Sequence, residues 1–165
     1  MAATRLDGVI NGRFPDDAPD RAFDCVVFND VLEHLDDPWR VLRETSSLVA
    51  PGGSVVASIP KVRHYSVLLP LALHGRWTYR DSGILDRTHV RFFTRATMVE
   101  LFETTGWRVE AVTATRLSVP TDGEVARVLA LLGRRAEPFR ARNYVVVATR
   151  AGEPPAGPSR PSARS

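Results

Sequence analysis

Two nearly continuous apolar runs stand out in the hydrophobic pattern of the chain. They are Phe23–Phe28 (FDCVVF) and Ser54–Ile59 (SVVASI). Unbroken runs of this length are typical of strands covered on both faces, as in a parallel sheet. Between them, Asp37-Pro38 predicts a helix start, because Asp caps helices and Pro fits the first helical position. The pattern therefore predicts one right-handed strand–helix–strand unit.

The predicted helix of this unit has apolar and small residues at helical spacing. The residues on that face are Trp39, Leu42, Ser46 and Val49. Pro51-Gly52-Gly53 is a strong breaker, so we expect the helix to stop there and the second strand to begin at Ser54.

Further along the chain the spacing of hydrophobic residues changes twice. Thr94 is a predicted N-cap, helical spacing follows it, and Gly106 ends that helix. Trp107–Leu117 alternates between apolar and polar residues, as an antiparallel or edge strand does. The remaining predicted elements are a strand remnant at Leu6–Ile10, a loop at Asp16–Arg21, helices at Val67–Leu73 and Val125–Leu132, and a last strand at Asn143–Thr149.

Composition predicts the domain limits and excludes several classes of protein. Residues 1–150 suit one domain, and residues 151–165 are rich in Pro, Ser and Arg, which predicts a disordered tail. The net charge is only +3 and the arginines are scattered among acids, so we expect no nucleic-acid surface. No apolar run approaches the ~18 residues of a membrane span, and the N-terminus lacks a signal peptide, which predicts a cytoplasmic protein. Cys25, the one cysteine, lies in an apolar run and is expected to be buried.

Several segments of the chain carry a family resemblance. The run FDCVVFNDVLEHLDDPWRVLRETSSLVAPGGSVVASIP resembles the fourth strand, following helix and fifth strand of class I S-adenosylmethionine-dependent methyltransferases. The run LDRTHVRFFTRATMVELFETTGW resembles the segment before their sixth strand, and NYVVVATR resembles their seventh. Together these pieces cover roughly residues 6–150. The resemblance implies an α/β fold, a truncated Rossmann-like sheet with strands in the order 4-5-7-6, the last one antiparallel, and flanking helices.

The first half of the family pattern has no counterpart in this sequence. The glycine-rich GxGxG loop that lets the backbone approach the cofactor is absent, and so is the acidic residue that binds the ribose hydroxyls. In the family the missing first strand pairs beside the fourth, so Phe23–Phe28 is expected to be an exposed sheet edge. Such an edge is available for self-association or for pairing with a partner. We expect an incomplete gene product in which Met1 is internal to a longer protein.

The resemblance also places cofactor-binding residues directly after the first apolar run. Asn29, Asp30 and Val31 stand where the family contacts S-adenosylmethionine. The position agrees with a general rule, because open α/β sheets bind ligands at the carboxyl ends of their strands. Asn and Asp side chains also accept hydrogen bonds from ribose, amine or adenine groups. The structural alternative is that Asn29 and Asp30 only cap the next turn.

An acid–histidine constellation follows these residues. Asp30, Glu33 and His34 have the spacing i, i+3, i+4, which places them on one face of a helical turn. Some relatives use this place, with a downstream histidine that corresponds to His89, to bind a divalent metal. We favour the interpretation that no metal binds and that Glu33 and His34 form hydrogen bonds or face the pocket.

The long connection between Lys61 and Phe93 resembles a lid over the substrate. His89 could act as a general base on a hydroxyl group, because an imidazole ring exchanges a proton near neutral pH. Tyr79 and Asp86 lie in the same segment and are candidates for substrate contact, or for packing in an ordered loop.

The resemblance predicts methyl transfer from S-adenosylmethionine to a small-molecule acceptor as the function of the parent family. Catalysis of this kind rests mostly on holding the nucleophile in line with the methyl group. Whether the chain is itself an enzyme is left open, because the glycine-rich loop is missing. The alternatives are a non-catalytic partner that docks through its sheet edge onto a complete methyltransferase, and a nonfunctional fragment.

Overall fold

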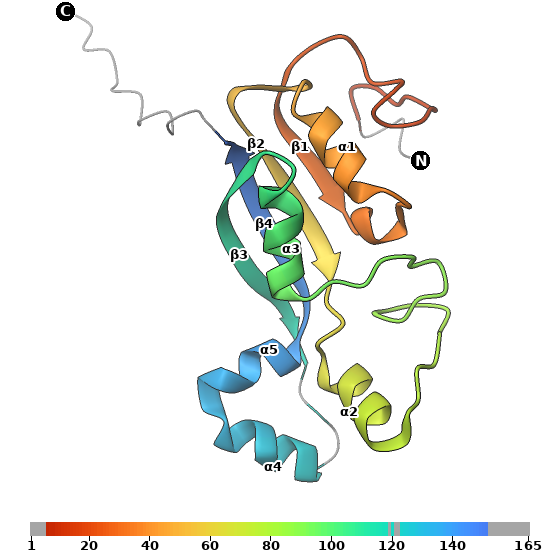
Figure 1. The fold of residues 1–165 in the computed structure, drawn as a ribbon, viewed down its shortest axis with the longest axis vertical. Coiled ribbons are helices and arrows are strands. Elements are labelled where there is room, and N and C mark those ends of the chain that lie inside the picture. Colours follow the sequence, from red (N-terminus) through yellow and green to blue (C-terminus); the bar gives the residue numbers. More distant parts are fainter. Residues whose placement is uncertain (1–5, 119, 121–122, 152–165) are drawn as a thin grey trace, which may run out of the picture.

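The computed structural model describes residues 6–118, 120 and 123–151, which form a mixed sheet with helices around it (Figure 1). Its strands are β1 (Phe23–Asn29), β2 (Val49–Pro60), β3 (Trp107–Leu117) and β4 (Ala141–Arg150). Its α-helices are α1 (Pro38–Thr45), α2 (Tyr65–His74), α3 (Arg95–Glu103), α4 (Gly123–Leu131) and α5 (Glu137–Arg140). Two 3-10 turns, η2 (Leu32–His34) and η3 (Gly133–Ala136), complete the order.

The sheet has the strand order β1-β2-β4-β3. Strands β1 and β2 are parallel, and β4 is antiparallel to both of its neighbours. This topology confirms the predicted order, with β1, β2, β4 and β3 in the places of the fourth, fifth, seventh and sixth strands. Of the predicted tail, residues 151–165, all but Ala151 lie outside the described residues.

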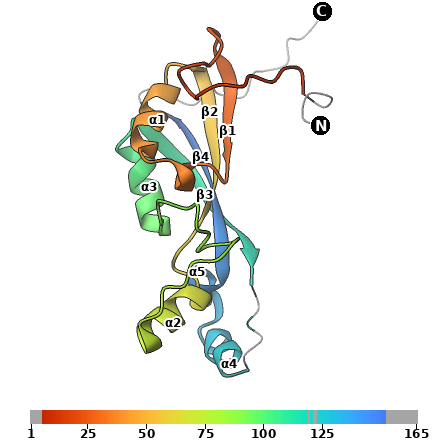
Figure 2. The same cartoon turned by 90° about the vertical axis from the view of Figure 1, so that its right-hand side faces the viewer.

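One face of the sheet is covered by α1 and α3 (Figure 2). On this helix-covered face Val55, Ala57 and Ile59 of β2 are fully buried. The helices begin where the sequence predicts: Asp37 accepts from the Arg40 amide at 2.9 Å, and Thr94 forms a capping box with Thr97. A buried hydrogen bond of 3.0 Å from the Trp107 indole to the Leu42 carbonyl ties β3 to α1.

The opposite face, called the open face below, carries neither of these helices (Figure 2). Val27 and Cys25 of β1 lie on it, and Val27 is 63% exposed. The expectations of a strand covered on both faces and of a buried Cys25 are therefore wrong. The physical reason is that β1 is the outermost strand and only one of its two side-chain rows meets helices.

Helix α1 is shorter than the sequence predicts. It ends at Thr45, and the amide of Phe23 donates to the carbonyl of Leu48 at 2.8 Å, so strand pairing has already begun at Val49. Pro51-Gly52-Gly53 lies inside β2 as an irregular stretch rather than at the end of a helix. A Cβ at Gly53 would lie 2.8 Å from the Asp24 carbonyl oxygen, so the close strand approach requires glycine there.

The other predicted elements agree with the structure, with one exception. Helices α2, α3 and α4 and strands β3 and β4 lie where the pattern predicts them. Leu6–Ile10 forms no strand. The loop that follows runs beside β1 and α1, where the Phe14 ring packs edge-on against Phe28 and Asp16 lies 4.0 Å from the Arg40 guanidinium. None of the described helices has the length and apolarity needed to cross a membrane.

Candidate functional site

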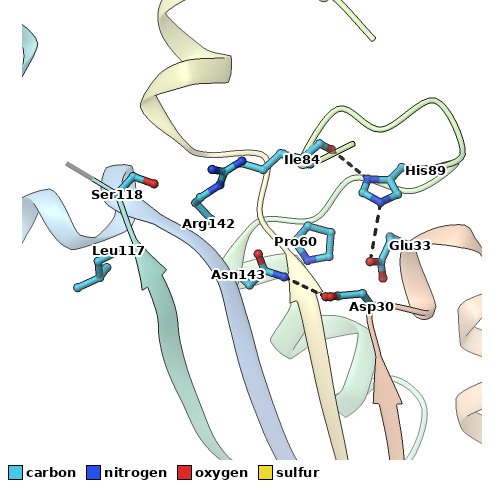
Figure 3. A pocket seen from close by; sticks show the side chains of 10 residues that line it. Asp30, Glu33, Pro60, Ile84, His89, Leu117, Ser118, Arg142 and Asn143 are labelled. Carbon is cyan, nitrogen blue, oxygen red and sulfur yellow. Dashed lines mark hydrogen bonds and ion pairs between the residues drawn. The ribbon is translucent and has the colours of Figure 1, made fainter. Parts of the chain in front are cut away.

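A cavity of about 420 Å³ lies at the carboxyl ends of β1 and β2. Figure 3 shows its side chains converging from the ends of the four strands and from the connection after α2. The residues that line it are Asp30, Glu33, Pro60, Gly83, Ile84, His89, Leu117, Ser118, Arg142 and Asn143. The cavity therefore stands at the sheet edge where open α/β folds place their ligands.

Asp30 is fixed at the floor of this cavity by both its backbone and its side chain. Its amide continues the strand pairing by donating to the Ser58 carbonyl at 3.1 Å, and its φ of 53° then turns the chain out of the sheet. Asp tolerates this left-handed conformation better than most residues. The carboxylate Oδ1 accepts hydrogen bonds of 2.9 Å from both the Ser58 hydroxyl and the Asn143 amide nitrogen. One carboxylate thus joins β1, β2 and β4.

Glu33 is the buried acid of the site. Its side chain is fully buried, and neither carboxyl oxygen has a hydrogen-bond partner among the described residues. The pKa of this carboxyl is raised to about 7, mainly by burial and then by the charge of Asp30, against the opposing effects of a backbone hydrogen bond and of His34. The Glu33 carbonyl accepts from the amides of Val90 and Arg91 at 2.9 and 3.0 Å, so the turn η2 is joined to the segment after α2.

His89 faces Glu33 across the cavity wall. Its Nε2 lies 3.9 Å from Glu33 Oε1, and its Nδ1 lies 3.0 Å from the carbonyl oxygen of Ile84 (Figure 3). A carbonyl only accepts, so Nδ1 carries the hydrogen and Nε2 keeps its lone pair when the ring is neutral. The cavity therefore contains a proton acceptor, His89 Nε2, beside the Glu33 carboxyl, which keeps part of its protons near neutral pH because its pKa is raised.

His34 joins these two residues in a compact cluster. Its ring lies 4.7 Å from the His89 ring, centroid to centroid, and its Nδ1 lies 3.1 Å from the Thr88 carbonyl oxygen. Ligand atoms of Glu33, His34 and His89 all lie within 4.8 Å of one another. Such a set fits a divalent transition metal, because both imidazoles donate through Nδ1 and the Glu33 oxygens are without partners. Asp30 is not part of this cluster, since its carboxylate is engaged by Ser58 and Asn143.

The other sequence-predicted residues do not line the cavity. Asn29 and Val31 flank Asp30 and are exposed. Tyr79 is 49% exposed and its ring lies 6.4 Å from that of Phe92. The Asp86 carboxylate accepts from the Thr88 amide and hydroxyl at 2.8 and 2.6 Å, which lowers the pKa of this carboxyl and orders the loop.

Several residues of the site were missed from the sequence. Ser58 and Asn143 hold Asp30 in place, and Arg142, Ser118 and Ile84 complete the wall. One signal was available for Asn143, which is an amide residue directly before the apolar run of the last strand. Arg142 is identified only by the antiparallel pairing of β4, which carries its first residues to the carboxyl end of β2. Ser58, Ser118 and Ile84 are identified only by the three-dimensional arrangement around the cavity.

Comparisons with known proteins concern the family and the fold of the chain. A family model described as a methyltransferase domain matches residues 5–112. Among solved structures, the fold is similar to a SAM-dependent methyltransferase from Archaeoglobus fulgidus, with 20% identity, 79% of this chain and 60% of that protein covered, and a TM-score of 0.50. It is also similar to an S-adenosylmethionine-dependent methyltransferase from Mesorhizobium loti, with 21% identity, 80% and 63% covered, and a TM-score of 0.47. The chain thus spans about three fifths of the length of these two proteins. No curated protein matches it.

Proposed function

Because the chain belongs to the methyltransferase domain family, we propose that it serves the transfer of a methyl group from S-adenosylmethionine to a small-molecule acceptor. The observation that carries the proposal is the coincidence of the family match with a polar cavity at the carboxyl ends of β1 and β2. In this proposal the cavity holds the acceptor, and the cofactor lies on the β1 side of Asp30.

The cofactor would be held by Asn29, Asp30 and Val31. These residues fit one wall of such a site, because Asp30 is rigidly placed while Asn29 and Val31 are exposed beside it at the outermost strand. When bound, S-adenosylmethionine supplies an electrophilic methyl group. The chain contributes orientation, which is the main requirement of a displacement in which the two reacting groups must stand in line.

The proton of the acceptor would be taken by His89. Its Nε2 is the free ring nitrogen, and the Nδ1 hydrogen bond to Ile84 holds the ring in that orientation. An imidazolium formed at His89 would be stabilised by Glu33, 3.9 Å away, which ionises readily near neutral pH because its pKa is about 7. His89 is thus the catalytic residue of the proposal. Glu33 is a positioning residue that stabilises the protonated form of His89.

Calorimetric titration of the purified chain with S-adenosylmethionine tests the proposal. We expect binding that Asp30→Asn weakens by roughly tenfold, the loss of about one charged hydrogen bond. Asp24→Asn, on the same strand but exposed at its other end, is the matched control and should bind as the parent does. Equal affinity of the Asp30→Asn variant would exclude Asp30 from the cofactor site.

The Glu33, His34 and His89 cluster supports a metal-assisted version of the same reaction. A divalent cation there could polarise an acceptor hydroxyl. Adding Mn²⁺ to chelator-treated protein separates the two versions by its effect on the melting temperature. A rise that Glu33→Gln abolishes supports the metal, and no rise in the parent chain supports His89 acting alone.

A second candidate function is that of a non-catalytic partner that docks through its sheet edge onto a methyltransferase. The 63% exposure of Val27 on the outermost strand favours it, because an apolar strand edge is a template for pairing with another chain. Absence of S-adenosylmethionine binding by the chain alone, together with stable association with another polypeptide, would favour this candidate over the first.

A further inference from the structure

A second, smaller cavity of about 90 Å³ adjoins the larger one beside the first turns of α2. The two cavities share Ile84 and Arg142 in their walls. The smaller cavity differs in its chemistry, since the charged residues in its lining are three arginines and no acid. Arginines and hydroxyl residues dominate its polar wall: Arg76, Arg80, Arg142, Ser66, Thr78 and Ser82.

Main-chain hydrogen bonds hold the backbone of the three arginines in place. The Arg80 amide donates to the Leu85 carbonyl at 2.8 Å, and the Arg80 carbonyl accepts from the Arg87 amide at 3.0 Å. Arg76 follows Gly75, the left-handed C-cap of α2, and its amide donates to the Pro70 carbonyl at 3.1 Å. Strand β4 carries Arg142, whose carbonyl accepts from the Lys61 amide at 2.8 Å.

The charge of this arginine wall is not neutralised within the described part of the chain. The same loop carries two acids: Asp81 pairs with Arg87 at 2.9 Å, and the Asp86 carboxylate accepts hydrogen bonds from Thr88. Neither acid forms an ion pair with the three wall arginines, and no other acid among the described residues does. The field of the wall also acts on His64: burial, and then the charges of Arg142 and Lys61, lower the pKa of this histidine to about 4. Three exposed arginines with hydroxyl side chains among them offer hydrogen-bond donors that match the oxygens of a phosphate or carboxylate.

We propose that the acceptor carries a compact anionic group, a phosphate or a carboxylate, that binds among Arg76, Arg80 and Arg142. The remainder of the acceptor then extends past Ile84 into the larger cavity, where its nucleophilic atom reaches His89. This inference rests on the proposed function for the meaning of the larger cavity. The anion site itself stands on the smaller cavity and can be tested without any methyl donor.

The test is a titration of the full chain with inorganic phosphate and, separately, with acetate, at constant ionic strength set by chloride. Amide chemical shifts of residues 76–85 and 142 give the readout. We expect saturable shifts with at least one anion, and the anion that binds more tightly identifies the group on the acceptor. Arg142→Gln and Arg80→Gln should each weaken binding by roughly tenfold.

Arg43→Gln is the matched control, because Arg43 is an exposed arginine in the last turn of α1, away from α2 (Figure 1). It should leave both titrations unchanged. Saturable binding that is equal in the parent, the Arg80→Gln variant and the Arg43→Gln variant would overturn the proposal, as would absence of saturation by both anions in the parent. Because these titrations contain no S-adenosylmethionine, they separate the anion site from the proposed function.

Discussion

The two faces of the sheet are built from similar residues but have different environments. On the helix-covered face, Val55, Ala57 and Ile59 of β2 are fully buried. On the open face, the pairing register places Val27, Val56, Val147 and Ala111 side by side, and Val27 is 63% exposed. An apolar composition therefore does not by itself establish burial. It indicates a surface that is suited to being covered, and here only one of two such surfaces is covered by the described helices.

The largest effect expected from this contrast is on stability. Ile59→Ala removes a fully buried side chain and should lower the free energy of unfolding by about 2–5 kcal/mol. Val27→Ala on the open face should change it by less than about 0.5 kcal/mol. Urea denaturation of both variants measures the difference. A similar loss in both would mean that the open face is covered in solution.

A second prediction compares a buried and an exposed histidine through the pH dependence of stability. His64 is buried and its pKa is lowered to about 4, so between the ordinary value of about 6.5 and 4 the unfolded chain takes up a proton that the folded protein does not. The contribution of His64 to stability is therefore lost as the pH falls through this window, by an amount on the order of 2–3 kcal/mol. The raised pKa of Glu33 gives a contribution of the opposite sign, which is lost as the pH rises toward 7.

His64→Asn should remove this contribution and so lower the slope of stability against pH, since Asn can still cap α2 but does not titrate. His74→Asn, at the exposed end of the same helix, is the control and should keep the slope of the parent. Urea midpoints at several pH values between 4 and 7 measure it. A parent-like slope in the His64→Asn variant would show that His64 is accessible to protons in the folded state.

The smallest effect on stability is expected from Val27→Lys at the free edge. A lysine there should change the free energy of unfolding by less than about 0.5 kcal/mol but should reduce self-association, because charged residues protect strand edges. Light scattering at increasing protein concentration measures association. Unchanged association in the variant would mean that the edge of β1 is not the contact.

The sequence predicted most of the fold because its signals are local. Asp37-Pro38 and Thr94 mark helix starts through side-chain capping, and both caps are present. The end of α1 was mispredicted because Pro51-Gly52-Gly53 breaks a helix and also permits a close strand approach, and only the pairing of Phe23 with Val49 distinguishes the two. The exposure of Cys25 was missed for a related reason, since burial depends on what packs above a strand and not on the strand's own residues.

The candidate site was predictable only in part. Glu33, His34 and His89 come together as the spacing and the resemblance imply, because the carbonyl of Glu33 is bound by the segment that follows His89. Asp30 separates from that set since its carboxylate is closer to Ser58 and Asn143, residues 28 and 113 positions away in the chain. Partnerships over such distances follow from strand order and register, which a motif does not contain.

Cys25 gives the protein a built-in chemical reporter. It is the one cysteine of the sequence, and its thiol is exposed on the outermost strand. A maleimide should therefore modify the molecule at a single position, and the rate of that reaction measures how much of the time this edge is open to solvent. Any polypeptide that covers the strand would slow the labelling, so the occupancy of the edge could be followed in a crude mixture without purification of the partner.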